Sequence, residues 1–152
     1  MNIWHDIRED RIKKNDFAAV IEIPKGCKNK YELDKETGLL RLDRILYTAT
    51  HYPANYGFIP KTYAGDHDPL DVLVLCNEKI IAIAKKDPFL NCYNDISELP
   101  TSITAEIMHF FKVYKQLEGK VTTVDKMMGR KEAEKIVANA IENYKKNFEN
   151  NK

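Results

Sequence analysis

Residues 65–74 read Gly-Asp-His-Asp-Pro-Leu-Asp-Val-Leu-Val, so three carboxylates stand directly before and at the start of an apolar strand. Asp66, Asp68 and Asp71 repel one another unless a cation lies between them. A set of oxygen ligands suits a hard cation such as Mg²⁺, Mn²⁺ or Ca²⁺. An EF-hand is excluded, because its sixth position would be Asp71 rather than glycine. The stretch therefore indicates either a metal site or a solvated acidic loop.

The segment 17–23 is rich in apolar and β-branched residues and predicts a strand before the acidic stretch. Strict alternation puts four apolar residues on one face, namely Phe17, Ala19, Ile21 and Ile23. Glu22 then lies on the opposite face, where a carboxylate is unusual for a strand of this apolar content.

Residues 30–34 and 39–44 predict a β-hairpin around a turn at residues 35–38. Alternation directs Lys30 and Glu32 to the same side of the first arm. On the second arm three residues share a face: Leu40, Leu42 and Arg44. Because Lys30 and Arg44 lie on opposite arms, both can reach one cleft.

Further strands are expected on both sides of the acidic stretch. Residues 52–57, Tyr-Pro-Ala-Asn-Tyr-Gly, form a turn-rich loop that leads into one of them. Residues 71–76 and 80–83 are two more short apolar strands. Since only Asn77, Glu78 and Lys79 separate these two strands, the sequence predicts a tight hairpin between them.

The apolar spacing becomes helical towards the C-terminus. One helix is expected between Ile103 and Leu117, with Pro100 before it and Gly119 after it. A second amphipathic helix runs from Ala133 to Phe148. Strands followed by two helices indicate a single α+β domain over residues 1–152, with a small antiparallel sheet or barrel and the helices packed against it.

The composition is that of a folded protein of 152 residues, 43% hydrophobic and 31% charged. Because 24 Lys+Arg stand against 23 Asp+Glu, no general attraction to nucleic acid or to an anionic membrane is expected. The sequence contains no secretory signal and no apolar run of membrane-spanning length. The widely spaced cysteines Cys27, Cys76 and Cys92 are expected to be reduced thiols in a cytoplasmic protein.

Cationic and phenolic side chains add a second chemical signal. The ammonium group of Lys30 and the guanidinium group of Arg44 suit a doubly charged phosphate. Three phenols can donate hydrogen bonds to phosphate oxygens: Tyr52, Tyr56 and Tyr114. Taken singly, each of these residues is more often a surface charge or a half-buried aromatic, and Lys115 alone is typical of a helix surface. Their presence beside three carboxylates favours a functional interpretation.

A series of sequence blocks follows in order along the chain: Val20-Ile21-Glu22-Ile23-Pro24, Lys30-Tyr31-Glu32, Asp43-Arg44, Tyr52-Pro53-Ala54-Asn55-Tyr56-Gly57, residues 65–74, Asp95-Ile96-Ser97-Glu98-Leu99-Pro100 and His109-Phe110-Phe111-Lys112-Val113-Tyr114-Lys115-Gln116-Leu117-Glu118. In these blocks the chain resembles the soluble inorganic pyrophosphatases. The resemblance covers most of the chain from Ala18 to Glu118, and the acidic run with its following strand is its most specific part.

The resemblance implies an OB-like antiparallel β-barrel with flanking helices and Mg²⁺-dependent hydrolysis of inorganic pyrophosphate to two phosphates, with Mn²⁺ as a second metal. It also implies a cytoplasmic homo-oligomer without nucleic-acid or membrane partners. Asp66, Asp71 and Glu22 would serve the metal ions, and Asp68 would take the proton of the attacking water. Phosphate binding falls to five residues: Lys30, Arg44, Tyr56, Tyr114 and Lys115. Two further residues belong to the cleft, Glu32 and Tyr52.

The chain departs from the family after Cys76. The family continues there into further strands and a loop that carries two more aspartates and a lysine. Here Asn77-Glu78-Lys79 runs straight into the next strand, and no aspartate lies between Asp71 and Asp87. Lys79 is a candidate for the family lysine. An internal deletion is therefore expected to leave the barrel incomplete and the first metal without a third carboxylate.

Two functions of different classes follow. The first is pyrophosphate hydrolysis, impaired by the loss of metal-ligand aspartates. The second is a non-catalytic protein that binds phosphate or assembles with an intact enzyme. Nucleic-acid binding by an OB-fold is a third function, which the acidic run and the absence of a basic stripe disfavour.

Overall fold

The computed structural model describes residues 2–74, 80–84, 87, 89–120, 122 and 126–149. Its strands are β1 (Ile12–Lys13), β2 (Asp16–Phe17), β3 (Val20–Ile23), β4 (Asn29–Leu33), β5 (Leu40–Ile45), β6 (Asn55–Phe58), β7 (Asp71–Val74) and β8 (Ile80–Ala82). Its helices are α1 (Thr101–Val113) and α2 (Arg130–Tyr144), the latter continued by a π-helical segment at Lys145–Glu149. Short 3₁₀ turns lie at Glu9–Arg11, Ile96–Glu98 and Gln116–Glu118. None of the described helices is long and apolar enough to cross a membrane.

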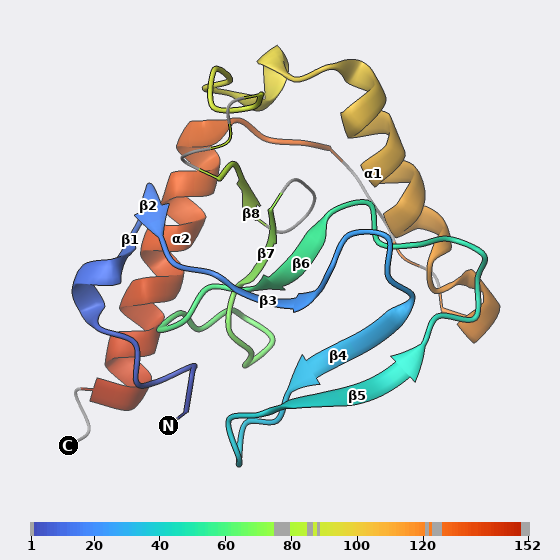
Figure 1. The fold of residues 1–152 in the computed structure, drawn as a ribbon. Coiled ribbons are helices and arrows are strands. Elements are labelled where there is room, and N and C mark those ends of the chain that lie inside the picture. Colours follow the sequence, from blue (N-terminus) through green and yellow to red (C-terminus); the bar gives the residue numbers. More distant parts are fainter. Residues whose placement is uncertain are drawn as a thin grey trace.

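The strands form one larger sheet and two hairpins (Figure 1). The larger sheet has the order β3-β6-β7-β8, while β4 pairs with β5 and β1 pairs with β2. Over the described residues these sheets do not close into a barrel. Strands followed by two C-terminal helices confirm the predicted α+β class, with a barrel that is incomplete.

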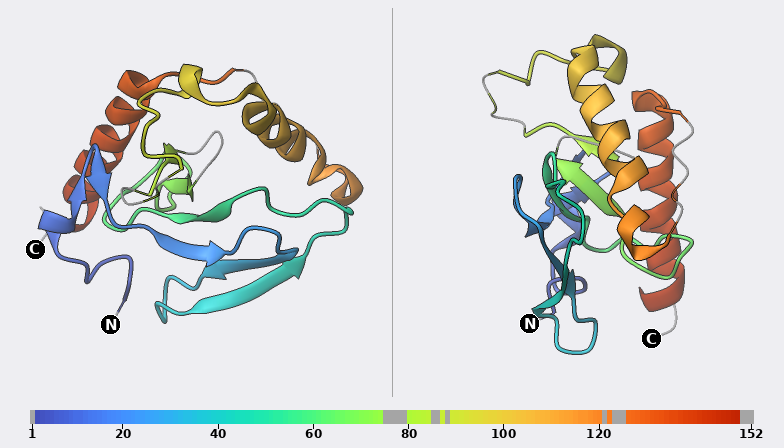
Figure 2. Two further views of the ribbon diagram at one scale, coloured as in Figure 1. Left: turned by 45° about the horizontal axis from the view of Figure 1, so that its top comes forward. Right: turned by 90° about the vertical axis from the view of Figure 1, so that its right-hand side faces the viewer.

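In Figure 1 α2 lies to the left of the larger sheet and α1 to its right, and the right view of Figure 2 shows both helices on one side of the strands. The α1 helix buries Ile107, Phe110 and Phe111 against a cluster that includes Tyr52 and Leu73. On α2, Val137 packs with Val72, Ile80 and other residues of a second cluster. Both helices confirm the predicted amphipathic patterns, because their buried residues recur at helical spacing.

The predicted start of the first helix is confirmed, but its predicted extent to Leu117 is wrong, because α1 ends at Val113 and Leu117 lies in a separate 3₁₀ turn, 68% exposed. Pro100 directly precedes α1. Gly119 follows the 3₁₀ turn Gln116–Glu118 with a φ of +69°, a left-handed conformation that favours glycine.

The predicted face of the strand at residues 17–23 is wrong at Ile21. In the structure β3 begins at Val20, and a bulge interrupts its antiparallel pairing with β6 between Ile21 and Ile23. Ile23 is fully buried, whereas Ile21 is 37% exposed. A bulge inserts one extra residue, here Glu22, and so breaks the alternation on which the prediction depended.

The predicted hairpin of β4 and β5 is confirmed, but the shared face of Leu40, Leu42 and Arg44 is wrong. A second bulge, at Asp43, separates the pair Lys30–Arg44 from the pair Tyr31–Leu42. Directly paired residues lie on the same side of a sheet. Arg44 therefore shares a side with Lys30, and Leu42 lies on the other side with Tyr31.

The predicted tight hairpin between residues 71–76 and 80–83 is also wrong, because β7 and β8 run parallel. Val72 pairs with Ile80 and Val74 pairs with Ala82. Parallel strands ordinarily need a crossover of a dozen or more residues, yet only residues 75–79 join these two. Those residues, which include Cys76 and the candidate Lys79, lie outside the described part of the chain.

A groove of about 930 Å³ opens beside the join between β7 and β8. Its walls include Val74 on β7, Ile80 on β8 and the half-exposed Ile21 on β3. The groove therefore borders the point at which the sequence predicts that residues are missing.

Candidate functional site

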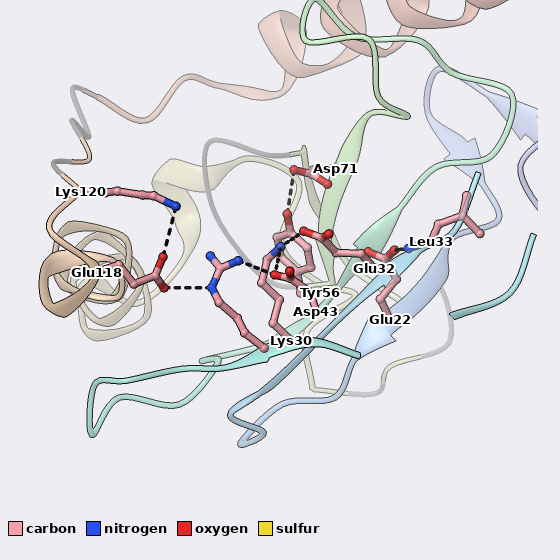
Figure 3. Close-up of polar contacts among 10 residues, drawn as sticks. Glu22, Lys30, Glu32, Leu33, Asp43, Tyr56, Asp71, Glu118 and Lys120 are labelled. Carbon is pink, nitrogen blue, oxygen red and sulfur yellow. Dashed lines mark hydrogen bonds and ion pairs between the residues drawn. The ribbon is translucent and has the colours of Figure 1, made fainter. Parts of the chain in front are cut away.

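Lys30 stands at the centre of a group of carboxylates on the β4–β5 hairpin (Figure 3). Its Nζ forms an ion pair with Glu32 and lies 3.4 Å from Asp43 Oδ2. The Lys30 side chain is only 13% exposed. Because Lys30 pairs directly with Arg44 across the two strands, the predicted meeting of these cations on one side of the hairpin is found in the structure.

Burial lowers the pKa of Lys30, because the charged ammonium loses hydration there. The carboxylate of Asp43 opposes this shift, while the positive charges of Arg44 and Lys115 add to it. Lys115, which comes from the segment after α1, therefore lies within electrostatic reach of the hairpin cations.

Two carboxylates hold the guanidinium group of Arg44. Its Nη1 donates to Asp43, and its Nε donates to Glu118 Oε1 at 3.0 Å. Glu118 also lies 3.5 Å from the Nζ of Lys120. Figure 3 shows these contacts as a chain from Lys120 through Glu118, Arg44 and Asp43 to Lys30.

The phenol of Tyr56 donates a hydrogen bond to Asp71 Oδ2 at 2.8 Å. Tyr56 lies on β6 and Asp71 opens β7, so the antiparallel pairing of these strands brings the two side chains together. Burial and the adjacent negative charge of Asp71 raise the pKa of Tyr56 well above its usual value. The phenol therefore keeps its proton and remains a donor at neutral pH.

Tyr52 joins the hairpin, the sheet and α1. Its ring is 2% exposed and lies 5.3 Å from the ring of Tyr56. Burial raises the pKa of Tyr52; Tyr114, Asp71 and Glu22 add to this shift, and the positive charge of Arg44 opposes it. These residues lie within electrostatic reach of one another, and we call them the cleft set, after the cleft that the family resemblance predicts: Glu22, Lys30, Arg44, Tyr52, Tyr56, Asp71, Tyr114 and Lys115.

Tyr114 and Lys115 enter the cleft set from the C-terminal end of α1. The Tyr114 ring stacks on Phe110 at 5.1 Å and is largely buried. The Nζ of Lys115 lies 5.2 Å from the centre of the same tyrosine ring, in a cation–π contact. Packing of α1 against the sheet therefore fixes both residues.

Glu22 is the extra residue of the β3 bulge and is 9% exposed. Its Oε1 accepts a hydrogen bond of 2.8 Å from the backbone N–H of Leu33 on β4. The carboxylate thereby connects the larger sheet with the β4–β5 hairpin. Alternation alone does not predict this placement.

The acidic loop before β7 has different partners. Asp68 forms an ion pair with Lys35, and both side chains are half exposed. Asp66 accepts a hydrogen bond of 3.3 Å from the Asp68 backbone N–H. Between them, His67 adopts a left-handed φ of +67°. In the described contacts, Asp66 and Asp68 therefore interact within the acidic loop and with Lys35. Asp71 interacts instead with Tyr56 of the cleft set.

The donors suit a divalent metal in kind, because carboxylate oxygens are the ligands that hard cations prefer. Within the described ranges, however, no three His, Cys, Asp or Glu side chains converge closely enough to hold an ion. Asp66 and Asp71 are the two carboxylates that the sequence predicts as ligands, and Mg²⁺ readily completes its shell with waters. The donors therefore match a hydrated cation in kind, and their use as its ligands stays a prediction.

Three charged residues that the sequence did not single out form ion pairs with the predicted site residues. Asp43 lies between Lys30 and Arg44, Glu118 binds Arg44 and Lys35 binds Asp68. Asp43 and Glu118 both stand in recognised blocks, yet nothing in their spacing indicates their partners. Their roles depend on a bulge and on a contact between distant segments.

Comparison with known proteins gives a consistent result. The family model described as inorganic pyrophosphatase matches residues 19–80 and 76–145, two segments that meet at the join between β7 and β8. Soluble inorganic pyrophosphatase 2 of Chlamydomonas reinhardtii is 42% identical over 171 positions, covering 95% of this chain and 89% of that protein. Because the chain has only 152 residues, some of these positions have no counterpart in it.

Other relatives agree in sequence and in structure. Soluble inorganic pyrophosphatase PPA1 of Solanum tuberosum is 44% identical, over 80% of this chain and 70% of that protein. The solved structure of inorganic pyrophosphatase from Helicobacter pylori superimposes with a TM-score of 0.81 at 32% identity. That alignment covers 92% of this chain and 99% of the other.

Proposed function

The chain belongs to the inorganic pyrophosphatase family, and from this premise we propose that it hydrolyses inorganic pyrophosphate to two phosphates with the help of a divalent cation. The observation that carries the proposal is the pair Lys30–Arg44 on one side of the hairpin. Two adjacent cations held by carboxylates form a suitable receptor for a highly charged phosphate. The relatives named soluble inorganic pyrophosphatases support the reaction class.

Binding and orientation of the substrate fall to the cleft set. Lys30 and Arg44 neutralise phosphate oxygens, and Lys115 adds a third positive charge within electrostatic reach. Packing positions the phenol of Tyr114 as a candidate donor, whereas the single O–H of Tyr56 is donated to Asp71 and would reach phosphate only by exchanging that bond. Because phosphoryl transfer needs little covalent help from the protein, such positioning and charge neutralisation carry most of the catalysis.

The proton of the attacking water is proposed to pass to Asp68. Its carboxylate is half exposed, so it is open to solvent, and the ammonium group of Lys35 holds it in the turn. Asp66 and Asp71, with Glu22 nearby, would hold the cation. When bound, a Mg²⁺ or Mn²⁺ ion at these residues lowers the pKa of a bound water and neutralises phosphate oxygens.

A non-catalytic function is the second candidate, and one observation favours it. In the described part of the chain no three potential metal ligands converge, while Lys30 and Arg44, the proposed cations for phosphate, pair across the hairpin. A protein of this kind would bind phosphate or pyrophosphate, or assemble with an intact enzyme, without turnover. Slow hydrolysis, impaired by the loss of metal-ligand aspartates, would be intermediate between full catalysis and binding without turnover.

Release of phosphate from pyrophosphate, with Mg²⁺ and with a chelator, separates these functions. Hydrolysis is expected with Mg²⁺ and not with the chelator, and Asp71→Asn should reduce it. Pyrophosphate binding without turnover would instead establish the non-catalytic function. No binding of pyrophosphate under either condition would refute both hydrolysis and non-catalytic phosphate binding, and would leave only assembly with an intact enzyme.

The finer biological setting follows from the same premise. We expect Mg²⁺ to be the working ion, with Mn²⁺ as a substitute, and a cytoplasmic homo-oligomer that engages neither nucleic acid nor membrane. Sedimentation of the purified chain tests the oligomeric state. Titration with each ion, monitored by calorimetry, tests the metal preference.

A further inference from the structure

Glu118 is a buried carboxylate next to the phosphate-binding cations. It ends the 3₁₀ turn Gln116–Glu118, and its side chain is 7% exposed. One oxygen accepts the hydrogen bond from Arg44 Nε at 3.0 Å, and the other lies 3.5 Å from Lys120. Such a carboxylate is costly to bury unless it is paired, so its two cationic partners account for its burial.

The contacts of Arg44 leave one nitrogen of its guanidinium group, Nη2, for a ligand. Nε donates to Glu118 and Nη1 donates to Asp43, whereas Nη2 has no hydrogen bond to any residue of the described ranges. Because a guanidinium group is planar, two fixed nitrogens set the direction of the third. Glu118 also occupies the Nε side, so a phosphate must approach Arg44 from its terminal nitrogens.

Glu118 also joins the two parts of the cleft set. Arg44 lies on β5, while Glu118 follows Tyr114 and Lys115 in the segment after α1. One ion pair therefore ties the hairpin cations to the phenol and ammonium from the other side of the cleft. Loss of this ion pair would remove a direct contact between the hairpin, which carries Arg44, and the segment after α1, which carries Tyr114 and Lys115.

We propose that Glu118 is a positioning residue for phosphate: it holds Arg44 so that Nη2 faces the substrate. The inference rests on the proposed function, since it assumes that Arg44 binds phosphate. Glu118 itself does not touch the substrate. Its effect on binding must therefore pass through Arg44, which makes the proposal testable by a double-mutant cycle.

The test measures the dissociation constants of phosphate and pyrophosphate by calorimetry at one Mg²⁺ concentration. Glu118→Ala is expected to weaken both by about tenfold, the scale of a hydrogen bond to a charged group. In an Arg44→Ala background the same substitution should change neither constant. Glu118→Gln, which keeps a hydrogen-bond acceptor of equal size, should restore part of the affinity and serves as the test variant if the alanine variant does not fold.

Glu134→Ala is the matched control. Glu134 accepts from Arg130 Nε at 2.9 Å, which is the same type of pair on the surface of α2. Its removal should leave both dissociation constants unchanged. A second readout needs no ligand: the Arg44 Nε–H resonance in NMR spectra should exchange slowly with solvent in the unaltered chain, rapidly in the alanine variant and at an intermediate rate in the glutamine variant.

The possible results are distinct. Unchanged affinity and unchanged Nε–H exchange in the Glu118 variants would overturn the positioning role while leaving the proposed function intact. An equal loss with and without Arg44 would also overturn it, because Glu118 would then act by another route. Failure of the unaltered chain to bind phosphate or pyrophosphate would overturn the proposed function together with this inference.

Discussion

Lys30 and Arg44 carry the same charge in the cleft but respond differently to pH. Burial lowers the pKa of Lys30 below that of an ordinary lysine. Arginine remains protonated at any pH at which the protein is folded. The phosphate receptor should therefore lose one of its two central cations at alkaline pH and keep the other.

This difference predicts a pH-dependent affinity for pyrophosphate. The dissociation constant should rise as the pH increases through the lowered pKa of Lys30, below the usual value near 10.5. Lys30→Arg should flatten the profile, because its charge persists. Calorimetric titrations over the alkaline range measure the pH profiles of the unaltered chain and of Lys30→Arg. A profile of the unaltered chain as flat as that of Lys30→Arg would contradict the role of Lys30 in binding pyrophosphate. The sign for stability is the opposite: the lowered pKa disfavours the charged folded state, and this penalty disappears as pH rises.

Tyr56 gives a second prediction at the scale of a residue. Tyr56→Phe removes the hydrogen bond to Asp71 and should lower the free energy of unfolding by about 1.5–3 kcal/mol, the range for a hydrogen bond to a charged group. It should also weaken binding of Mg²⁺ and pyrophosphate, because Asp71 loses an orienting contact. Denaturant unfolding and calorimetry measure the two effects. Tyr47→Phe, at a residue 68% exposed, is the control, and equal behaviour of the two variants would refute the role of Tyr56.

At the scale of elements, two bulges shape the cleft. The β3 bulge directs the carboxylate of Glu22 to the backbone of β4, and the bulge at Asp43 brings Arg44 to the side of Lys30. Both lie in strands that the sequence predicted correctly in position. Bulges re-aim side chains near functional sites, but they arise from the pairing of two strands and leave no sign in the periodicity of one.

The join between β7 and β8 carries the third prediction. Inserting a family-like segment with two aspartates between Cys76 and Ile80 should raise both Mg²⁺ affinity and turnover, by at least about tenfold, or about 1.4 kcal/mol of transition-state stabilisation. The reason is that the activating cation gains carboxylate ligands, and the adjacent groove of about 930 Å³ offers room for the added residues.

Steady-state phosphate release at matched Mg²⁺ and protein concentrations measures the effect. An insertion of equal length made of Gly and Ser is the control, because it lengthens the join without supplying carboxylates. If the chain as it stands releases phosphate as fast as the restored chain, the additional aspartates are dispensable and the interpretation of the metal site is wrong.

For the whole molecule, buried phenols limit stability at high pH. Burial raises the pKa of Tyr144 to about 12 and raises those of Tyr52 and Tyr56 as well. A raised folded-state pKa contributes stability that is complete below the unfolded value near 10 and is lost as pH rises through the folded value. The free energy of unfolding should therefore fall steadily above about pH 10.

Chemical denaturation at neutral and alkaline pH measures this fall. Tyr56→Phe should reduce its slope, while the exposed control Tyr47→Phe should not. Tyrosinate absorbance should increase together with the loss of secondary structure. Phenolate formation by these buried residues in a fully folded chain would contradict the prediction.

Most of the fold could be predicted from the sequence, because its signals are local. Pro100 and the helical spacing from Ile103 predicted α1, although the helix ends at Val113 and Gly119 instead follows the 3₁₀ turn Gln116–Glu118. The parallel direction of β7 and β8 was missed, since pairing direction depends on the whole sheet. In the same way, the partner of Glu118 lies on a strand far away in the chain, and only the folded structure reveals the contact.

The parallel pair β7–β8 has one more consequence, for the kinetics of folding. Only residues 75–79 separate the two strands, so their pairing closes a small loop. The entropic cost of loop closure rises by about 0.6 kcal/mol for each doubling of loop length. The pairing of β7 with β8 is thus local in the sequence, and local contacts favour fast folding. The chain should consequently refold faster than a variant in which the join is lengthened.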